Sequence, residues 1–183
     1  LLLIDAGCEV GCYASDITRT FPINGRFTRQ QRAVYDVVLE ANLAAIAAVK
    51  PGAHWNAPHE AAVKVITHGL VRLGLLKGRT AQLQQKLAYR KYYMHRTGHW
   101  LGLDVHDVGD YKVGDEWRVL EPGMVLTIEP GIYIAPGLRG VPPRFRGIGI
   151  RIEDDVVVTP DGCEVLTSGV PKDPAEIEAL MAA

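Results

Sequence analysis

Acidic residues interrupt the most apolar stretches of this 183-residue chain, and their placement is the strongest constraint on how it folds. Glu129 stands in MVLTIEPGIYI and Glu153 in GIGIRIEDDVVV, both of which have the composition of strands. An ionised carboxylate in such surroundings has a large desolvation cost unless a cation or a metal ion accompanies it. The alternatives are a strand-end Glu129 bonded to backbone amides and a solvent-facing pair of Arg151 with Glu153. Asp154 and Asp155 are expected to begin a solvated strand end.

Two further acids flank the first predicted turn, in LLLIDAGCEVGCYASDITRTFP. The pattern predicts a β-hairpin, because two strand-like runs surround a turn that contains glycine. In its second strand Asp16, Thr18 and Thr20 share one face, since side chains alternate along a strand. Asp5 and Asp16 either cap turns or provide the first ligands of a metal site, and this stretch alone leaves both possibilities open.

The order of the predicted elements indicates an α+β fold in one domain, residues 1–183. A helix is expected after Thr28, which forms a capping-box pattern with the glutamine three residues later, and to end at Pro51. A second helix is expected over residues 58–73 and a shorter one after Thr80. Gly-rich strands and turns follow from Tyr92. Helices precede most strands without βαβ alternation, which favours α+β over α/β.

Composition excludes several classes of protein. A hydrophobic fraction of 48% with 22% charged residues indicates a globular chain. The net charge of −1 and scattered basic residues give no footprint for nucleic acid, so no nucleic-acid partner is expected. No apolar run reaches the roughly 18 residues of a membrane span, so no membrane partner is expected. Three cysteines without a CxxC pair favour a reducing compartment, which predicts a cytoplasmic protein.

Histidines cluster in HRTGHWLGLDVHD, which contains His95, His99 and His106. The spacing of four between the first two resembles a helical metal pair, but no Glu follows His95, so the HExxH pattern fails. The glycines between them also argue against a regular helix. A single histidine here would more often be a core or turn residue, and Trp100 is expected only to pack. Three of the chain's six histidines within twelve residues favour a site.

Taken together, four carboxylates and at least one imidazole lie on or beside predicted strands. An oxygen-rich set with one nitrogen suits two hard-to-borderline divalent ions, such as manganese, better than a structural zinc. Bridging carboxylates would let two ions about 3.5–4 Å apart activate one water molecule.

The ordered motifs DAG…SDITRTFP, HWLGLDVHDVG, LEPGMVLTIEPGIYI and FRGIGIRIEDD resemble the catalytic domain of the pita-bread-fold metallopeptidases, in the branch of the bacterial Xaa-Pro aminopeptidases. The resemblance covers essentially the whole chain. It implies a curved antiparallel sheet flanked by helices, and two divalent metal ions, with Mn²⁺ expected. Five metal ligands follow from the motifs: Asp5, Asp16, His99, Glu129 and Glu153. Asp16 and Glu153 are the expected bridging ligands.

The resemblance also implies the reaction and its residues. The expected activity releases the N-terminal residue from peptides whose second residue is proline. Glu129 would move a proton, and His95 and His106 would bind substrate and stabilise the oxyanion. Arg151 would support the ligands, and Tyr133 would line the substrate pocket. A peptide beginning Xaa-Pro is the expected partner, and a homo-oligomer the expected state.

Two rival functions and two departures accompany this expectation. Prolidase shares the fold and ligands but cleaves only Xaa-Pro dipeptides, and some pita-bread proteins lose the metals and bind partners. Arg96 stands where the family usually has glycine. The family's N-terminal domain and the opening of its catalytic domain have no counterpart here, so we expect a catalytic domain that is incomplete at its N-terminus and inactive by itself.

Overall fold

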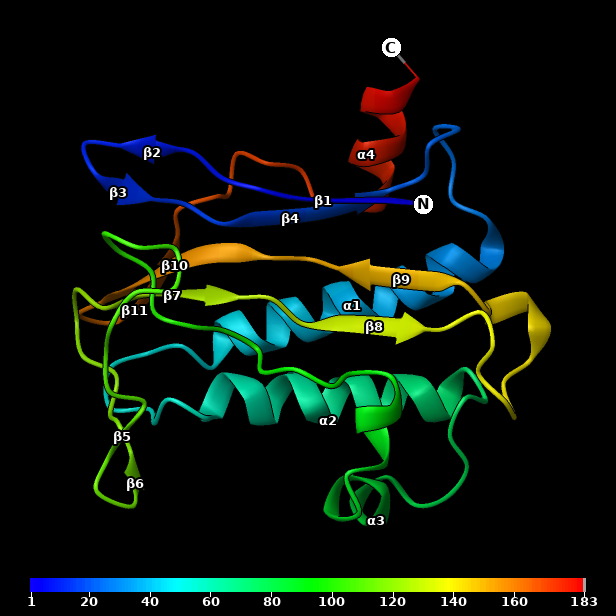
Figure 1. The fold of residues 1–183 in the computed structure, drawn as a ribbon, viewed down its shortest axis with the longest axis horizontal. Coiled ribbons are helices and arrows are strands. Elements are labelled where there is room, and N and C mark those ends of the chain that lie inside the picture. The colour runs from blue at the N-terminus through cyan, green and yellow to red at the C-terminus, as the bar shows by residue number, and fades with distance from the viewer. Residues whose placement is uncertain (183) are drawn as a thin grey trace.

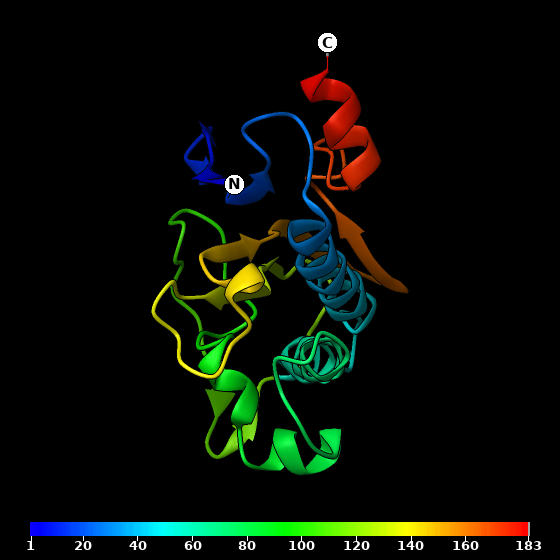
Figure 2. The same ribbon diagram turned by 90° about the vertical axis from the view of Figure 1, so that its right-hand side faces the viewer.

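A computed structural model describes residues 1–182 of the chain. Helices α1 and α2 lie together on one side of strands β7, β8 and β9 (Figures 1 and 2). The elements, in chain order, are β1 (Leu2–Ala6), β2 (Glu9–Val10), β3 (Tyr13–Ala14), β4 (Ile17–Phe21), α1 (Arg29–Ala47), α2 (Ala57–Arg72), α3 (Thr80–Gln85), η1 (Ala88–Lys91), β5 (Lys112–Val113), β6 (Glu116–Trp117), β7 (Val125–Ile128), β8 (Gly131–Ile134), η2 (Pro143–Phe145), β9 (Ile148–Arg151), β10 (Asp154–Thr159), β11 (Gly162–Val165) and α4 (Pro174–Met181).

A long two-stranded antiparallel ribbon forms the centre of the strand layer. Residues 125–134 run beside residues 148–159, with β7 paired to β10 and β8 paired to β9 (Figure 1). The pairing stops between the two halves, at Glu129 and Pro130 on one side and at Ile152 and Glu153 on the other. Pro130 has no N–H for the ladder, which accounts for part of the break. The ribbon therefore presents both glutamates at its interruption.

The hairpin of β1 and β4 lies against this interruption. Asp5 is paired with Thr18 in its register. The Glu153 N–H donates to the Thr18 carbonyl at 3.0 Å, and the Thr20 hydroxyl donates to the Arg151 carbonyl at 2.9 Å. Because Glu153 lies between β9 and β10 and is not paired within the ribbon, its backbone N–H bonds to the hairpin instead. This contact brings the first and the last predicted acids together.

The two long helices confirm the sequence expectations. Thr28 caps α1, with both bonds of the capping box present. The helices approach so closely that a Cβ built on Gly69 of α2 would lie 2.3 Å from Cγ1 of Val37 in α1, which explains why glycine stands there. The buried Asn42 of α1 donates to the Ile128 carbonyl at 3.2 Å and so fixes the helix to the end of β7.

The hydrophobic core lies between these helices and the ribbon. Six of its large, fully buried members are Tyr35, Ile66, Leu70, Ile128, Ile132 and Ile150. Inward-facing Ile132 and Ile150 are directly paired across β8 and β9, as strand alternation predicts. Among the described helices, none has the length and hydrophobicity that crossing a bilayer requires.

The expectation for Asp154 and Asp155 is wrong. Both residues are buried at the start of β10, with Asp154 0% and Asp155 2% exposed. Asp154 accepts bonds from Arg19 at 2.8 Å and from Lys172 at 2.7 Å. These two cations come from β4 and from the segment before α4, so they could not be matched to Asp154 by position in the sequence.

Candidate metal centre

The four acids and one histidine predicted as ligands come together at the ribbon's interruption. Their side-chain atoms fall into groups whose members lie within 4.8 Å of one another. One group is Asp5, Asp16 and Glu153, and a second is His99, Glu129 and Glu153. A third joins Asp16 and His99 to His106, which was not among the predicted ligands. Three residues belong to two groups each: the predicted bridging ligands Asp16 and Glu153, and His99.

Backbone contacts of three different elements hold these residues in place. Asp5 lies near the end of β1, and Asp16 directly precedes β4, where its N–H donates to Oδ2 of Asp155 at 3.1 Å. The Glu129 N–H donates to the Thr97 carbonyl at 2.7 Å, which ties the end of β7 to the histidine-bearing loop. Each ligand position is therefore set by the hydrogen bonding of its own segment.

Glu153 is the most deeply buried of the five, with 2% of its surface exposed. Its Oε2 accepts from the Thr18 hydroxyl at 2.5 Å, and Nε of Arg151 lies 3.7 Å from the same oxygen. Burial, followed by the charge of Glu129, raises the pKa of Glu153 to about 8.

Burial also raises the pKa values of two neighbouring acids, Asp16 and Glu129. Burial, followed by the side chain and charge of Asp5, raises the pKa of Asp16 to about 7. Burial also raises the pKa of Glu129 to about 7, with Arg151 acting in the opposite direction. Within residues 1–182, Arg151 is the one Lys or Arg that forms a salt bridge with any of the four acids. One guanidinium therefore faces four carboxyl groups, and divalent cations are the further partners that this oxygen-rich donor set fits.

The histidine of the cluster has the tautomer that a metal ligand needs. Nδ1 of His99 donates to the Trp100 carbonyl at 3.0 Å. Its Nε2 then keeps a lone pair and faces Oδ2 of Asp16 at 3.4 Å and Oε1 of Glu129 at 3.8 Å. Burial lowers the pKa of His99, so the ring is neutral near pH 7.

The other two histidines lie beside this cluster. Nδ1 of His95 bonds the Arg96 carbonyl at 2.7 Å, so Nε2 accepts from the Tyr133 hydroxyl at 2.8 Å. The same Nδ1 lies 3.8 Å from Oε2 of Glu129. His106 is exposed, and its ring packs edge-on against that of His99, with centroids 4.3 Å apart. The two histidines predicted to bind substrate thus lie next to predicted ligands.

Arg151 connects several of these groups. Its Nη2 donates to Oδ2 of Asp5, and its Nε donates to the Thr18 hydroxyl at 3.0 Å. Thr18 in turn bonds Glu153. Arg151 therefore orients ligand-bearing side chains on both the hairpin and the ribbon, and is not a solvent-facing partner of Glu153 alone.

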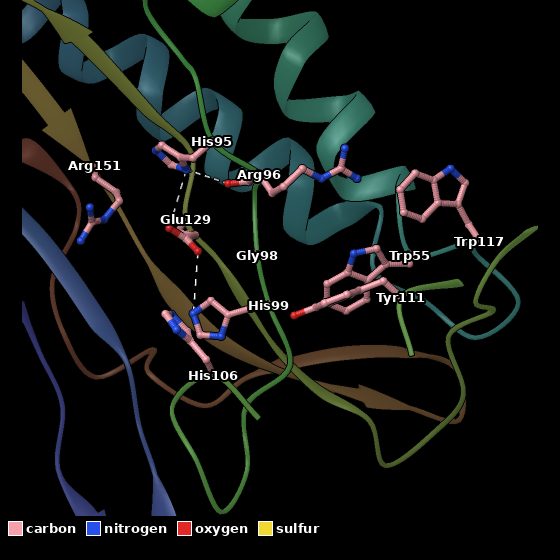
Figure 3. Close-up of a pocket in the computed structure, with 10 residues that line it drawn as sticks. All are labelled: Trp55, His95, Arg96, Gly98, His99, His106, Tyr111, Trp117, Glu129 and Arg151. Carbon is pink, nitrogen blue, oxygen red and sulfur yellow. Dashed lines mark hydrogen bonds and ion pairs between the residues drawn. The ribbon is translucent and has the colours of Figure 1, made fainter. Parts of the chain in front are cut away.

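A cavity of about 670 Å³ opens in front of the cluster (Figure 3). Five of the predicted site residues line it: His95, His99, His106, Glu129 and Arg151. Five other lining residues were not predicted as site residues: Trp55, Arg96, Gly98, Tyr111 and Trp117. Tyr133 lines a second cavity of about 320 Å³, and its hydroxyl bonds to His95 of the main cavity. The aromatic residues carry no motif, although the departure at Arg96 was visible in the sequence.

Comparisons with known proteins agree with this geometry. Residues 1–160 match the model of metallopeptidase family M24. The Xaa-Pro aminopeptidase of Escherichia coli is 55% identical over 183 residues, which are 100% of this chain and 41% of that protein. The Xaa-Pro aminopeptidase of Haemophilus influenzae is 52% identical, over 99% of this chain and 42% of that protein.

Solved structures give the same result for the fold. Pseudomonas aeruginosa aminopeptidase PepP superposes with a TM-score of 0.97 at 69% identity, over 98% of this chain and 41% of its own. A variant of Escherichia coli aminopeptidase P in complex with substrate gives 0.94 at 54% identity, over 98% of this chain and 40% of its own. The predicted α+β pita-bread architecture and the predicted resemblance are confirmed. The chain spans about two fifths of the length of these relatives, and it belongs to metallopeptidase family M24.

Proposed function

We propose that this chain carries the metal centre of an aminopeptidase that releases the N-terminal residue from peptides with proline in second position. The observation that carries the proposal is the convergence of four acids and His99, which form groups of three whose ligand atoms lie within 4.8 Å of one another, beside an open cavity. The names of the relatives support the substrate class. Since the chain spans about two fifths of those relatives, the activity is a property of the whole protein, in which it is to be measured.

The proposed centre binds two divalent ions, with Mn²⁺ as the favoured metal. Asp5, Asp16, His99, Glu129 and Glu153 would hold them, and Asp16 and Glu153 would each contact both. When bound, the ions supply Lewis-acid polarisation of the scissile carbonyl and a lowered pKa of water. A homo-oligomeric state and a cytoplasmic location stay predictions from the sequence.

The remaining steps use the chain's own side chains. Glu129, which lines the cavity between His95 and His99, would accept a proton and return it to the leaving amine. His106 projects into the cavity beside His99 and would donate a hydrogen bond to the oxyanion (Figure 3). His95, held by Tyr133, would position the peptide against Glu129, while Arg151 positions ligands without touching the substrate's reacting atoms.

Two rival functions make different predictions. A prolidase would share the same ligands but act only on dipeptides. A metal-free binding module would not require the ligand set, which is complete here. Substrate length and metal content separate the three cases.

The substrate assignment is tested on the whole metal-loaded protein with three peptides: Ala-Pro-Ala, Ala-Ala-Ala and the dipeptide Ala-Pro. We expect release of alanine from Ala-Pro-Ala with proline at the new N-terminus, at least about 100-fold faster than from Ala-Ala-Ala, because a site formed around the imino ring discriminates by shape. Mass spectrometry of the products identifies the cleaved bond. Efficient turnover of the dipeptide alone would establish a prolidase, and metal-free protein without turnover would support the binding module.

His106 provides a second test, because geometry also groups it with Asp16 and His99. We expect His106→Ala to lower kcat by about 100-fold, the usual contribution of one oxyanion donor, while bound metal stays at the wild-type level. His106→Asn should recover part of the loss, since an amide can donate the same bond. The matched control is His68→Ala on the exposed face of α2. Metal loss parallel to activity loss in His106→Ala would instead make His106 a ligand.

A further inference from the structure

Aromatic rings line one end of the main cavity, and the proposed catalytic mechanism gives them no role. In Figure 3, Trp55, Tyr111 and Trp117 lie to one side of Glu129 and His99, and Arg151 lies to the other. Trp55 and Tyr111 pack with ring centroids 4.8 Å apart. Tyr111 also stacks parallel to the buried Trp100 at 6.1 Å, which fixes this wall to the core. The rings therefore form a rigid surface within the cavity.

Two cations face the outermost ring of this wall. The guanidinium of Arg96 lies 5.0 Å from the centroid of Trp117, and Nζ of Lys112 lies 4.7 Å from the same centroid. Lys112 and Trp117 are directly paired across β5 and β6, so the lysine's position is set by the hairpin. Cation–π attraction holds both groups over the ring and limits their movement.

The charge of Arg96 is not neutralised within the described part of the chain. Its one side-chain hydrogen bond there joins Nη2 to Oδ1 of Asn56, which leaves most of the five guanidinium N–H groups free. Asn56 also donates to Glu60 at 2.6 Å, but neither Arg96 nor Lys112 forms an ion pair in residues 1–182. An exposed guanidinium fixed over an aromatic ring, with free donors, is suited to bind a carboxylate in bidentate fashion.

This cationic surface is directly connected to the catalytic residues. The Arg96 carbonyl accepts from Nδ1 of His95, and both residues line the same cavity of about 670 Å³. That volume is in the range of cavities that enclose a whole ligand and exceeds what one side chain needs. A peptide positioned by His95 therefore has a second part within reach of Arg96.

We propose that Arg96 and Trp117, assisted by Lys112, form a subsite that recognises a carboxylate of the peptide substrate away from the scissile bond. This inference rests on the proposed function and adds a preference for acidic peptides to it. The carboxylate is either the side chain of a substrate aspartate or glutamate or the peptide's C-terminal carboxylate. Trp117 would pack against the apolar stem of that residue while Arg96 binds its charge.

The experiment compares acidic peptides with neutral analogues of the same shape on the whole metal-loaded protein. Ala-Pro-Glu-NH₂ against Ala-Pro-Gln-NH₂ tests a side chain after proline, and Glu-Pro-Gln-NH₂ against Gln-Pro-Gln-NH₂ tests the N-terminal residue. Ala-Pro-Gln with a free C-terminus against its amide tests the terminal carboxylate. We expect kcat/KM to favour the acidic member of at least one pair by about 5-fold, as for a partly exposed charge pair.

The variant that tests the residue is Arg96→Gln. We expect it to reduce the acid-to-neutral ratio of that pair to near one, and Trp117→Ala to reduce it as well. The matched control is Arg144→Gln, since Arg144 is an exposed arginine that lies 5.1 Å from the ring of Phe145 but outside the cavity. This control should keep the wild-type ratio. Melting temperatures show whether each variant is folded.

Binding separates failure of the subsite from failure of the proposed function. The same peptide pairs are titrated against tryptophan fluorescence, which reports on Trp55 and Trp117 of the cavity without requiring turnover, and Trp117→Ala identifies the part of the signal that comes from Trp117. If no Xaa-Pro bond is cleaved, the proposed function is wrong, and the acid-to-neutral ratio of Kd still tests the subsite. Equal values for acidic and neutral peptides in the wild type, or an unchanged preference in Arg96→Gln, would overturn the inference.

Discussion

Replacing Glu153 by glutamine, or Asp16 by asparagine, is expected to abolish peptide cleavage and to lower the bound metal in parallel. Both residues are predicted bridging ligands, and in the proposed centre each would hold both ions; their ligand atoms lie within 4.8 Å of those of other predicted ligands. The amide keeps the shape of the side chain but removes the negative charge. Since losing a residue that only supports a ligand costs about 10–100-fold in metal affinity or activity, losing a shared ligand should cost at least about 100-fold.

The measurement is metal content per protein after dialysis, together with kcat/KM for Ala-Pro-Ala. Glu164→Gln is the matched control, because Glu164 is an exposed glutamate on β11 outside all three groups. It should retain wild-type metal and activity. Full metal occupancy in both Glu153→Gln and Asp16→Asn would refute the ligand assignment, whatever happens to the activity.

Much of the candidate site was predictable because its residues stand out locally. Glu129 and Glu153 are acids within apolar strands, and local sequence alone marks them as candidates for pairing with a cation, although it left backbone bonding and a solvent-facing ion pair open. The capping box at Thr28 and the helix that follows it depend only on neighbours within one turn. Such features depend on interactions between residues that are close in the sequence, so they can be predicted from the sequence alone.

Other features depend on contacts between distant segments, and the sequence hides these. The aromatic wall joins Trp55, which lies before α2, to Tyr111 and Trp117 around a later hairpin, and no periodicity links them. The capping of α4 by Asp173 is local, yet this helix was not predicted, because its apolar run is short. The three-way geometry of His106, Asp16 and His99 likewise exists only in the folded chain.

Asp154 shows most clearly that contacts between distant segments are not visible in the sequence, since its two cationic partners come from β4 and from the segment before α4. Asp154→Ala is expected to lower the free energy of unfolding by about 3–5 kcal/mol, the usual cost of leaving buried charges without their partner. Arg19, itself 8% exposed, would lose its ion pair, and Thr167 would lose the acceptor for its hydroxyl at 2.8 Å.

The pH dependence has a defined sign. Burial opposes ionisation of Asp154, but Arg19 and Lys172 outweigh it and lower the pKa of the carboxyl below its ordinary value of 3.8. A carboxyl whose pKa is lower in the folded than in the unfolded state stabilises the protein at pH values above the unfolded pKa. This stabilisation is lost as the pH falls through the folded-state pKa. The difference in stability between wild type and Asp154→Ala should therefore be full at pH 6 and shrink in strong acid.

Urea unfolding of the metal-free whole protein measures the effect, and Asp36→Ala is the matched control. Asp36 accepts from Arg32 at 2.6 Å, as close a contact as that of Asp154 with Lys172, but its side chain is 49% exposed against 0% for Asp154. An exposed pair contributes about 0.5 kcal/mol, so burial and not distance should decide the result. Metal content in folded Asp154→Ala should stay near that of the wild type, which separates this residue from its neighbour Glu153. A loss of less than about 1 kcal/mol would mean that the buried pair barely stabilises the fold, as occurs when desolvation cancels the attraction.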